Sequence, residues 1–135
     1  MKFGYVLAFR NPPELSRIPD PEFYAAMFEQ IAYADEVGFE TIWTTEHHFV
    51  DDGYLAAMMP MMAMIAARTK RIKVGSFVLL APFYHPLRLA EDAALIDVVF
   101  GGRLRLGIGV AYRPEEFEIF QIPRAERLSR TLETI

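Results

Sequence analysis

Glu46, His47 and His48 stand together directly after a short run of β-branched and aromatic residues, Thr41 to Thr45. Such a run is typical of a buried strand, because these side chains pack well on a pleated surface. In parallel α/β folds catalytic groups gather at the ends of strands, since helices cover both faces of the sheet. Histidine can take or give a proton near neutral pH, because its unperturbed pKa is about 6.5.

His47 and His48 are adjacent in the sequence, which limits the directions in which their side chains can point. Successive strand residues point to opposite sides, so both rings cannot face one substrate if the strand continues through them. We therefore expect one of the two to be a hydrogen-bonded structural histidine. From position alone, the cluster is as compatible with a structural turn as with a proton-transfer site.

A metal site built from this cluster and His85 is disfavoured. Neighbouring residues rarely chelate one ion, and the sequence has neither His-x-His nor His-x-x-x-His spacing. A second group of acids, Glu91, Asp92 and Asp97, is expected to cap loops or to pair with Arg88 and Arg103 rather than to catalyse.

The composition bounds the class of protein. The chain has 135 residues, of which 53% are hydrophobic and 24% charged, as in a single globular domain. Its net charge of −4 argues against nucleic-acid binding, and the basic residues between 68 and 73 are expected to form a solvated turn. Cysteine is absent, which excludes disulfides and thiolate chemistry. We see no signal peptide and no apolar run long enough for a membrane span, and expect a cytoplasmic protein.

Strand and helix patterns alternate along the chain. Asp20-Pro21-Glu22 predicts a helix start, with Asp20 as the capping residue, and Gly38 predicts the end of that helix. The expected strands cover residues 2–9, 41–45, 72–80 and 104–109, and the expected helices cover residues 20–37, 56–67, 87–100 and 115–120, with a last helix from about 124.

The helix at 56–67 is apolar nearly all round, with five methionines and a proline in its first turns. A helix that is apolar on every side is buried on every side. Its cover is either a second subunit, which would make the protein a homodimer or heterodimer through this helix, or the remainder of its own chain.

The order βαβαβαβα predicts right-handed parallel units, in an open doubly wound sheet or in a barrel. A complete eight-fold barrel takes about 250 residues. We therefore expect either a four-stranded protein or a barrel cut short after four units.

Motifs along the whole chain resemble the luciferase-like monooxygenases, and the opening resembles bacterial luciferase. The resemblance rests on residues that occur in the same order and spacing, namely Met1-Lys2-Phe3-Gly4, Pro12-Pro13-Glu14-Leu15-Ser16, Trp43, Glu46-His47-His48-Phe49, Val74-Gly75, Pro82, His85-Pro86, Leu89-Ala90-Glu91-Asp92, Ile96-Asp97, Gly102-Arg103, Leu106-Gly107 and Glu116-Phe117. It matches only the N-terminal half of such an enzyme.

The resemblance implies that residues 1–135 are the N-terminal half, about four βα units, of a single (βα)8 TIM barrel. Such enzymes use reduced FMN, supplied by a flavin reductase, and O2 to oxidise a small organic substrate, an aldehyde in the luciferases. Relatives of the same fold use deazaflavin F420 to move hydride without oxygen. A third alternative is a truncated, non-catalytic module for flavin binding or dimerisation. We expect residues 1–135 alone to be an incomplete monooxygenase.

The resemblance also implies roles for individual residues. His47 matches the family's catalytic histidine, His48 a supporting one, and Glu46 a carboxylate near the flavin. Phe77 and Val78 match a dipeptide whose backbone lies against the flavin ring through a non-prolyl cis peptide. The implied cofactor-binding set is completed by Ser76, Gly109, Val110 and Tyr112. Val110 stands where the family often has a phosphate-binding arginine, and Arg113 is a candidate substitute.

Overall fold

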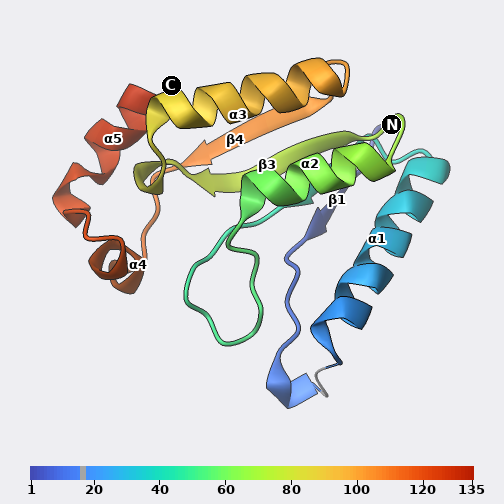
Figure 1. Ribbon diagram of the computed structural model, residues 1–135, viewed down its shortest axis with the longest axis horizontal. Helices are drawn as coiled ribbons and strands as arrows, with labels where there is room; N and C mark the ends of the chain where they lie inside the picture. Colours follow the sequence, from blue (N-terminus) through green and yellow to red (C-terminus); the bar gives the residue numbers. More distant parts are fainter. Residues whose placement is uncertain (16–17) are drawn as a thin grey trace.

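The fold is built on a four-stranded parallel sheet. The computed structural model describes residues 1–15 and 18–135 (Figure 1). The strands are β1 (Gly4–Leu7), β2 (Thr41–Thr44), β3 (Lys73–Leu80) and β4 (Leu104–Gly109), and their order in the sheet is β1-β2-β3-β4. A doubly wound sheet reverses its strand order at a switch point, whereas a barrel adds each strand beside the last. Between the two architectures left open by the sequence, the observed order is that of a partial barrel.

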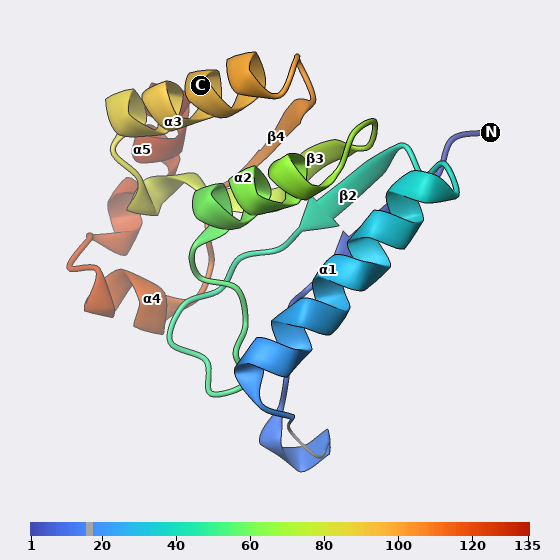
Figure 2. The ribbon, with the colours of Figure 1, turned by 45° about the vertical axis from the view of Figure 1, so that its right-hand side comes forward.

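Three helices cover one face of this sheet (Figures 1 and 2). They are α1 (Asp20–Glu36), α2 (Met58–Arg68) and α3 (Pro86–Val99). Beyond β4 the chain forms α4 (Pro114–Ile119) and α5 (Arg127–Thr134), and short 3-10 turns occupy η1 (Pro13–Leu15), η2 (Ala81–Phe83) and η3 (Arg124–Glu126). The predicted alternation of strands and helices is therefore confirmed, with boundaries shifted by one to three residues at most ends.

The opposite face of the sheet carries Val6, Trp43 and Gly75 in one row, since these residues are register partners on three neighbouring strands. The Trp43 indole lies over both glycines of its neighbours, where a Cβ on Gly75 would come within 2.6 Å of the ring and one on Gly4 within 2.8 Å. Val6 and Phe77 on this face are 51% and 61% exposed. No helix of the described residues covers them, as expected for the inner face of a barrel.

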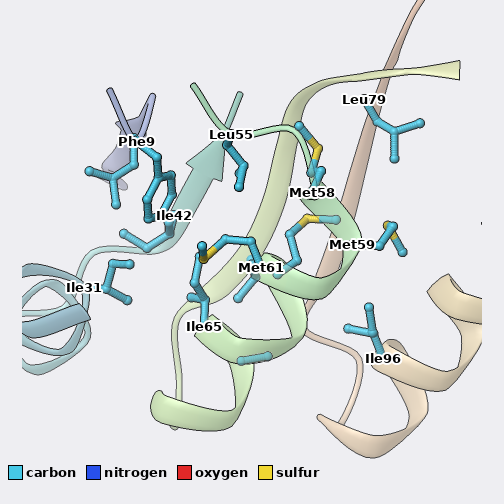
Figure 3. Packing of buried hydrophobic residues seen from close by; sticks show 14 of the residues in the cluster. Phe9, Ile31, Ile42, Leu55, Met58, Met59, Met61, Ile65, Leu79 and Ile96 are labelled. Carbon is cyan, nitrogen blue, oxygen red and sulfur yellow. The ribbon is translucent and has the colours of Figure 1, made fainter. Parts of the chain in front are cut away.

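The core lies between the sheet and the helices, with the Met-rich helix α2 at its centre (Figure 3). Met58, Met62 and Ile65 are fully buried there, between Ile31 of α1 and Ile96 of α3. The prediction that this helix is buried on every side is wrong for one stripe. Pro60 and Met64, four residues apart and so on one face, are exposed, because α1, α3 and the sheet cover only the other sides.

The start of α1 also differs from the prediction. Asp20 is the first helical residue and Pro19 occupies the cap position, so the expected side-chain cap by Asp20 is wrong. The Asp20 carboxylate instead accepts a hydrogen bond from the Asn11 amide at 3.1 Å. Gly38 follows the helix with φ of +89°, which glycine adopts without steric cost, and confirms the predicted end.

The acids on α3 have the structural roles that we expected. Arg88 pairs with Glu91 at 3.6 Å and with Asp92 at 3.2 Å on the helix surface. Asp97 accepts a hydrogen bond from the backbone of Leu104 at the start of β4. Arg103 does not pair with these acids but donates to backbone carbonyls, among them those of Ala66 and Ile72.

The basic residues between 68 and 73 lie around the turn that joins α2 to β3. Within the turn, Arg71 donates to the Asp35 carbonyl and Lys73 pairs with Glu40, so these cations are engaged locally. In the parts of the chain that the structure describes, no helix is both long and apolar enough to span a bilayer.

Candidate active site

The second half of β3 and the loops that follow β2 and β4 line a pocket of about 430 Å³ at the carboxyl edge of the sheet. Seven of the predicted site residues line it, namely Glu46, His47, Phe77, Val78, Gly109, Val110 and Tyr112. Val6, Thr45, Tyr54, Leu80 and Ala111 complete the lining. A volume of this size lies in the range of small-molecule sites, about 300–1,000 Å³.

His47 lines the pocket, and contacts with neighbouring side chains hold its imidazole ring at the edge of the pocket. Its Nδ1 atom lies 3.0 Å from Glu116 Oε1. The rings of Tyr54 and Tyr112 meet the imidazole edge-on, with centroids 4.9 and 5.7 Å away. The side chain is 19% exposed, so it is held by contacts and still reachable from the pocket.

His48 points away from the pocket, although β2 ends at Thr44 and the alternation of a strand does not extend to the two histidines. Its ring meets the stacked rings of Phe83 and Phe120 edge-on, with centroids 5.8 and 4.8 Å away. Its Nε2 is buried 3.3 Å from Glu46 Oε1, without the geometry of a hydrogen bond. The structure therefore brings only one of the two predicted catalytic histidines to the pocket.

Glu46 ties the end of β2 to the end of β3. Its Oε2 accepts a 2.6 Å hydrogen bond from the Leu80 backbone, and its Oε1 accepts one of 2.5 Å from the Tyr84 hydroxyl. Burial, together with the neighbouring Glu46 carboxylate, raises the pKa of Tyr84 above its ordinary value. Tyr84 thus stays a proton donor to Glu46 at neutral pH.

Glu116 is a site residue that the sequence reasoning missed. It belongs to the short helix α4 and is only 1% exposed. Its Oε1 accepts a hydrogen bond from the His48 backbone at 2.9 Å and contacts the His47 ring, whereas its Oε2 has no partner among the described residues. The Pro114-Glu115-Glu116-Phe117 stretch indicates a helix start, but nothing in it reveals a contact with a histidine 69 positions away.

The end of β3 contains the Phe77–Val78 peptide, which is cis, as the resemblance implied. The register of β3 with β4 shifts between Ser76 and Leu79, around this peptide. Gly109 lies so close that an added Cβ would come within 2.4 Å of the Val78 side chain, which requires glycine there.

Ser76 is the predicted cofactor contact that does not reach the pocket. It is fully buried, and its hydroxyl donates to the Gly107 carbonyl at 2.9 Å and accepts from the Gly107 backbone at 3.0 Å. Both interactions join β3 to β4. They explain its polarity without a ligand.

The pocket suits the flat, mainly apolar ring system of a flavin. Apolar and aromatic side chains form most of its wall, and the buried Thr45 hydroxyl has no partner among the described residues. None of the lining residues is cationic. Arg113 lies 3.7 Å from Glu116 Oε1 and 3.5 Å from the His48 carbonyl, and does not line the pocket. The described residues therefore fit the ring better than the phosphate of a flavin nucleotide.

Within the described ranges, no group of three or more histidine or acidic residues is arranged to hold a metal ion. The site is an aromatic and apolar pocket with one imidazole at its edge and buried carboxylates behind it.

Comparison with known proteins gives the context of this geometry. The sequence profile of the family described as luciferase-like monooxygenase matches residues 1–135. The chain is 33% identical over 120 residues to the alkanal monooxygenase alpha chain of Photorhabdus laumondii subsp. laumondii, which covers 89% of this chain and 33% of that protein.

Two solved structures have the same fold. The monooxygenase RslO1 from Streptomyces bottropensis superposes with a TM-score of 0.88 at 34% identity, over 99% of this chain and 41% of that one. The oxygenating constituent of 3,6-diketocamphane monooxygenase from Pseudomonas putida, in complex with FMN, superposes with a TM-score of 0.87 at 23% identity, over 99% of this chain and 37% of that one.

The chain thus spans about a third of the length of the alkanal monooxygenase that it matches. Its four parallel strands correspond to part of the barrels of these enzymes. With the profile matched from the first residue to the last, the chain belongs to the luciferase-like monooxygenase family.

Proposed function

We propose that residues 1–135 form the N-terminal half of a luciferase-like TIM barrel and supply the proton-transfer group and one wall of the FMN site of a flavin-dependent monooxygenase. The observation that carries this proposal is His47, held at the edge of an apolar pocket at the carboxyl ends of the strands. The alpha chain of alkanal monooxygenase, by its name, oxidises alkanals, which supports an aldehyde as the small organic substrate.

The chain's residues have separable tasks in this proposal. His47 gives or takes a proton at the ring atom facing the pocket. Phe77, Val78 and Val110 supply apolar walls that keep water from the reacting centre. Glu46 and Tyr84 hold the end of β3 in place. When bound, reduced FMN supplies the electrons with which molecular oxygen is activated.

FMN is favoured as the cofactor because a structure of the same fold, the Pseudomonas putida enzyme, is an FMN complex. F420, which would make the protein a hydride-transferring oxidoreductase, is the alternative. Anaerobic titration of the chain with reduced FMN and with reduced F420, followed by absorbance, separates the two. Stronger retention of F420 would overturn the FMN assignment, and retention of neither would leave residues 1–135 without a cofactor role.

The partners belong to the same proposal. A flavin reductase supplies reduced FMN, and a second subunit packs on the exposed stripe of α2 around Pro60 and Met64. That stripe borders an apolar groove of about 540 Å³ between α1 and α2, which also contains Tyr24 and Phe28. Light scattering of the chain should give twice the monomer mass, and Met64→Asp should return it to one.

Turnover is best measured in a complete barrel, in which residues 1–135 replace the matching segment of RslO1. His47→Ala should lower decanal-dependent oxygen consumption of this chimera by about 100-fold, with FMN binding largely kept, because a positioned acid or base contributes about 10²–10⁴-fold. His85→Ala is the matched control, since that histidine is exposed and outside the pocket. A loss below about threefold would remove His47 from the chemistry.

A further inference from the structure

We propose that Glu116 is a positioning residue, which fixes the tautomer and orientation of the His47 ring so that Nε2 is the unprotonated atom facing the pocket. The inference rests on the proposed role of His47. It adds a residue for which the sequence and the family resemblance suggested no role.

The first step is the direction of the hydrogen bond. A carboxylate oxygen is an acceptor only, so the 3.0 Å contact with Glu116 Oε1 requires a proton on His47 Nδ1. A neutral imidazole carries one proton, which leaves Nε2 with its lone pair. Because His47 lines the pocket while Nδ1 is occupied by Glu116, Nε2 is the ring atom available to a reacting group.

The second step is the rigidity of the acceptor. Glu116 Oε1 also accepts the His48 backbone N–H at 2.9 Å, so one oxygen binds two consecutive residues. The carboxylate therefore cannot rotate away from the ring without depriving the partly buried His48 N–H of its acceptor, which costs about 1 kcal/mol or more. The edge-on rings of Tyr54 and Tyr112 contact the imidazole on two further sides.

The third step is that Glu116 is poorly explained as a stabilising residue. Its Oε2 is buried without a partner in the described chain, although burying an unsatisfied oxygen is costly. Arg113, at 3.7 Å from the other oxygen, is the nearby cation, and it also pairs loosely with Glu115. A buried acid retained at such a cost, against the ring of a site histidine, points to a role in the site.

The test reads the tautomer directly, by nitrogen NMR of the chain labelled with ¹⁵N-histidine at pH about 9, where an ordinary imidazole is neutral. The measurement needs neither flavin nor turnover, so it can fail or succeed independently of the proposed monooxygenase function. For the wild-type chain we expect His47 to carry its proton on Nδ1. A proton on Nε2, alone or together with one on Nδ1, overturns the inference.

Two variants distinguish a positioning role of Glu116 from a contribution to stability alone. Glu116→Gln should keep the Nδ1–H form, because the His48 N–H selects the amide oxygen for the shared acceptor position. Glu116→Ala should release the ring and lose that form. Glu115→Ala is the matched control, because the Glu115 side chain is 66% exposed and does not contact His47. Unchanged His47 signals in a folded Glu116→Ala chain, or loss of the Nδ1–H form in a folded Glu116→Gln chain, would contradict the assignment.

The kinetic consequence is measured in the RslO1 chimera. Glu116→Ala should lower kcat by about tenfold or more, with the KM for the aldehyde little changed, because the proton-transfer group is present but misoriented. Glu116→Gln should restore most of that loss, whereas an equal loss in both variants would contradict positioning through the hydrogen bond.

Discussion

The two ends of the sheet each contain a buried carboxylate that ties neighbouring loops together, and they use it differently. At the amino end, Asp35 binds three successive backbone N–H groups, with Oδ1 accepting from Arg71 and Ile72 and Oδ2 accepting from Lys70. At the carboxyl end, Glu116 binds a backbone N–H and a histidine ring with one oxygen, and its other oxygen has no partner in residues 1–15 and 18–135. The first acid is fully satisfied by structure, whereas the second retains unused hydrogen-bonding capacity beside a pocket.

This difference agrees with the general organisation of TIM barrels, in which residues at the carboxyl ends of the strands take part in catalysis and residues at the amino ends stabilise the fold. Backbone conformation shows the same division. Phe9, Phe49 and Ala111 have φ values between +52° and +55°, and each follows the carboxyl end of a strand, whereas Gln121, with φ of +55°, follows α4. Side chains rarely adopt this region, so the chain tolerates strain where the site is built.

The largest change in stability is expected from Asp35→Ala. Three backbone N–H groups lose their acceptor, and we expect the free energy of unfolding to fall by about 3 kcal/mol in urea denaturation at pH 7. Glu36→Ala, one residue along and exposed, is the control and should change little. A loss below about 1 kcal/mol would show that solvent replaces these bonds and would remove the contrast with Glu116.

The same variant predicts a pH dependence. Burial alone would raise the pKa of Asp35, but the hydrogen bonds from residues 70–72 and the charge of Arg71 outweigh it and lower that pKa. Asp35 therefore contributes stability above about pH 4, the ordinary carboxyl pKa, and this contribution is lost as the pH falls through its lower folded value. The difference between wild type and Asp35→Ala should shrink with acidification, and a constant difference would contradict the assignment.

A smaller effect is expected at the other end from Tyr84→Phe. Removing the hydroxyl deprives the buried Glu46 of one donor, which should cost about 1.5 kcal/mol. Because the pKa of Tyr84 is raised in the folded state, its contribution is present below about pH 10 and declines above it, when the tyrosine of the unfolded chain ionises. Urea denaturation between pH 8 and about 11 should show a shallower alkaline decline for Tyr84→Phe than for wild type. Tyr33→Phe, on the exposed face of α1, should leave that slope unchanged.

The smallest change in stability is expected from Glu40→Gln. This variant compares the ion pairs of Glu40 with the hydrogen bonds of Asp35 at the amino end of the sheet. Glu40 directly precedes β2 at the amino end of the sheet and pairs with Lys2 and Lys73, and these two lysines lower its pKa. The pair with Lys2 is exposed and the pair with Lys73 is partly exposed, so solvent and salt screen both. We expect no measurable change in the midpoint of urea denaturation, and a clear loss would show that charge at this end stabilises the sheet as much as buried hydrogen bonds do.

Local sequence information was sufficient for most of the fold. The four strands, helix α3 to within one residue at each end and the glycine after α1 follow from propensity and from the geometry of proline and glycine, which act within a few residues. The Asp20 cap was wrong because the Asn11 amide, in a loop nine residues earlier, binds that carboxylate. The burial of α2 was overestimated because an apolar composition cannot tell which stripe its neighbours leave open.

By itself, the sequence determined the order of the elements and the family of the protein. Only the tertiary structure decided that His47 lines the pocket, that the Ser76 hydroxyl is used within the sheet and that Glu116 reaches the imidazole. The physical reason is the distance along the sequence over which each effect acts. Propensity and alternation act between neighbours in the chain, whereas parallel strands bring together at one edge residues that lie tens of positions apart, and their contacts exist only after the sheet has formed.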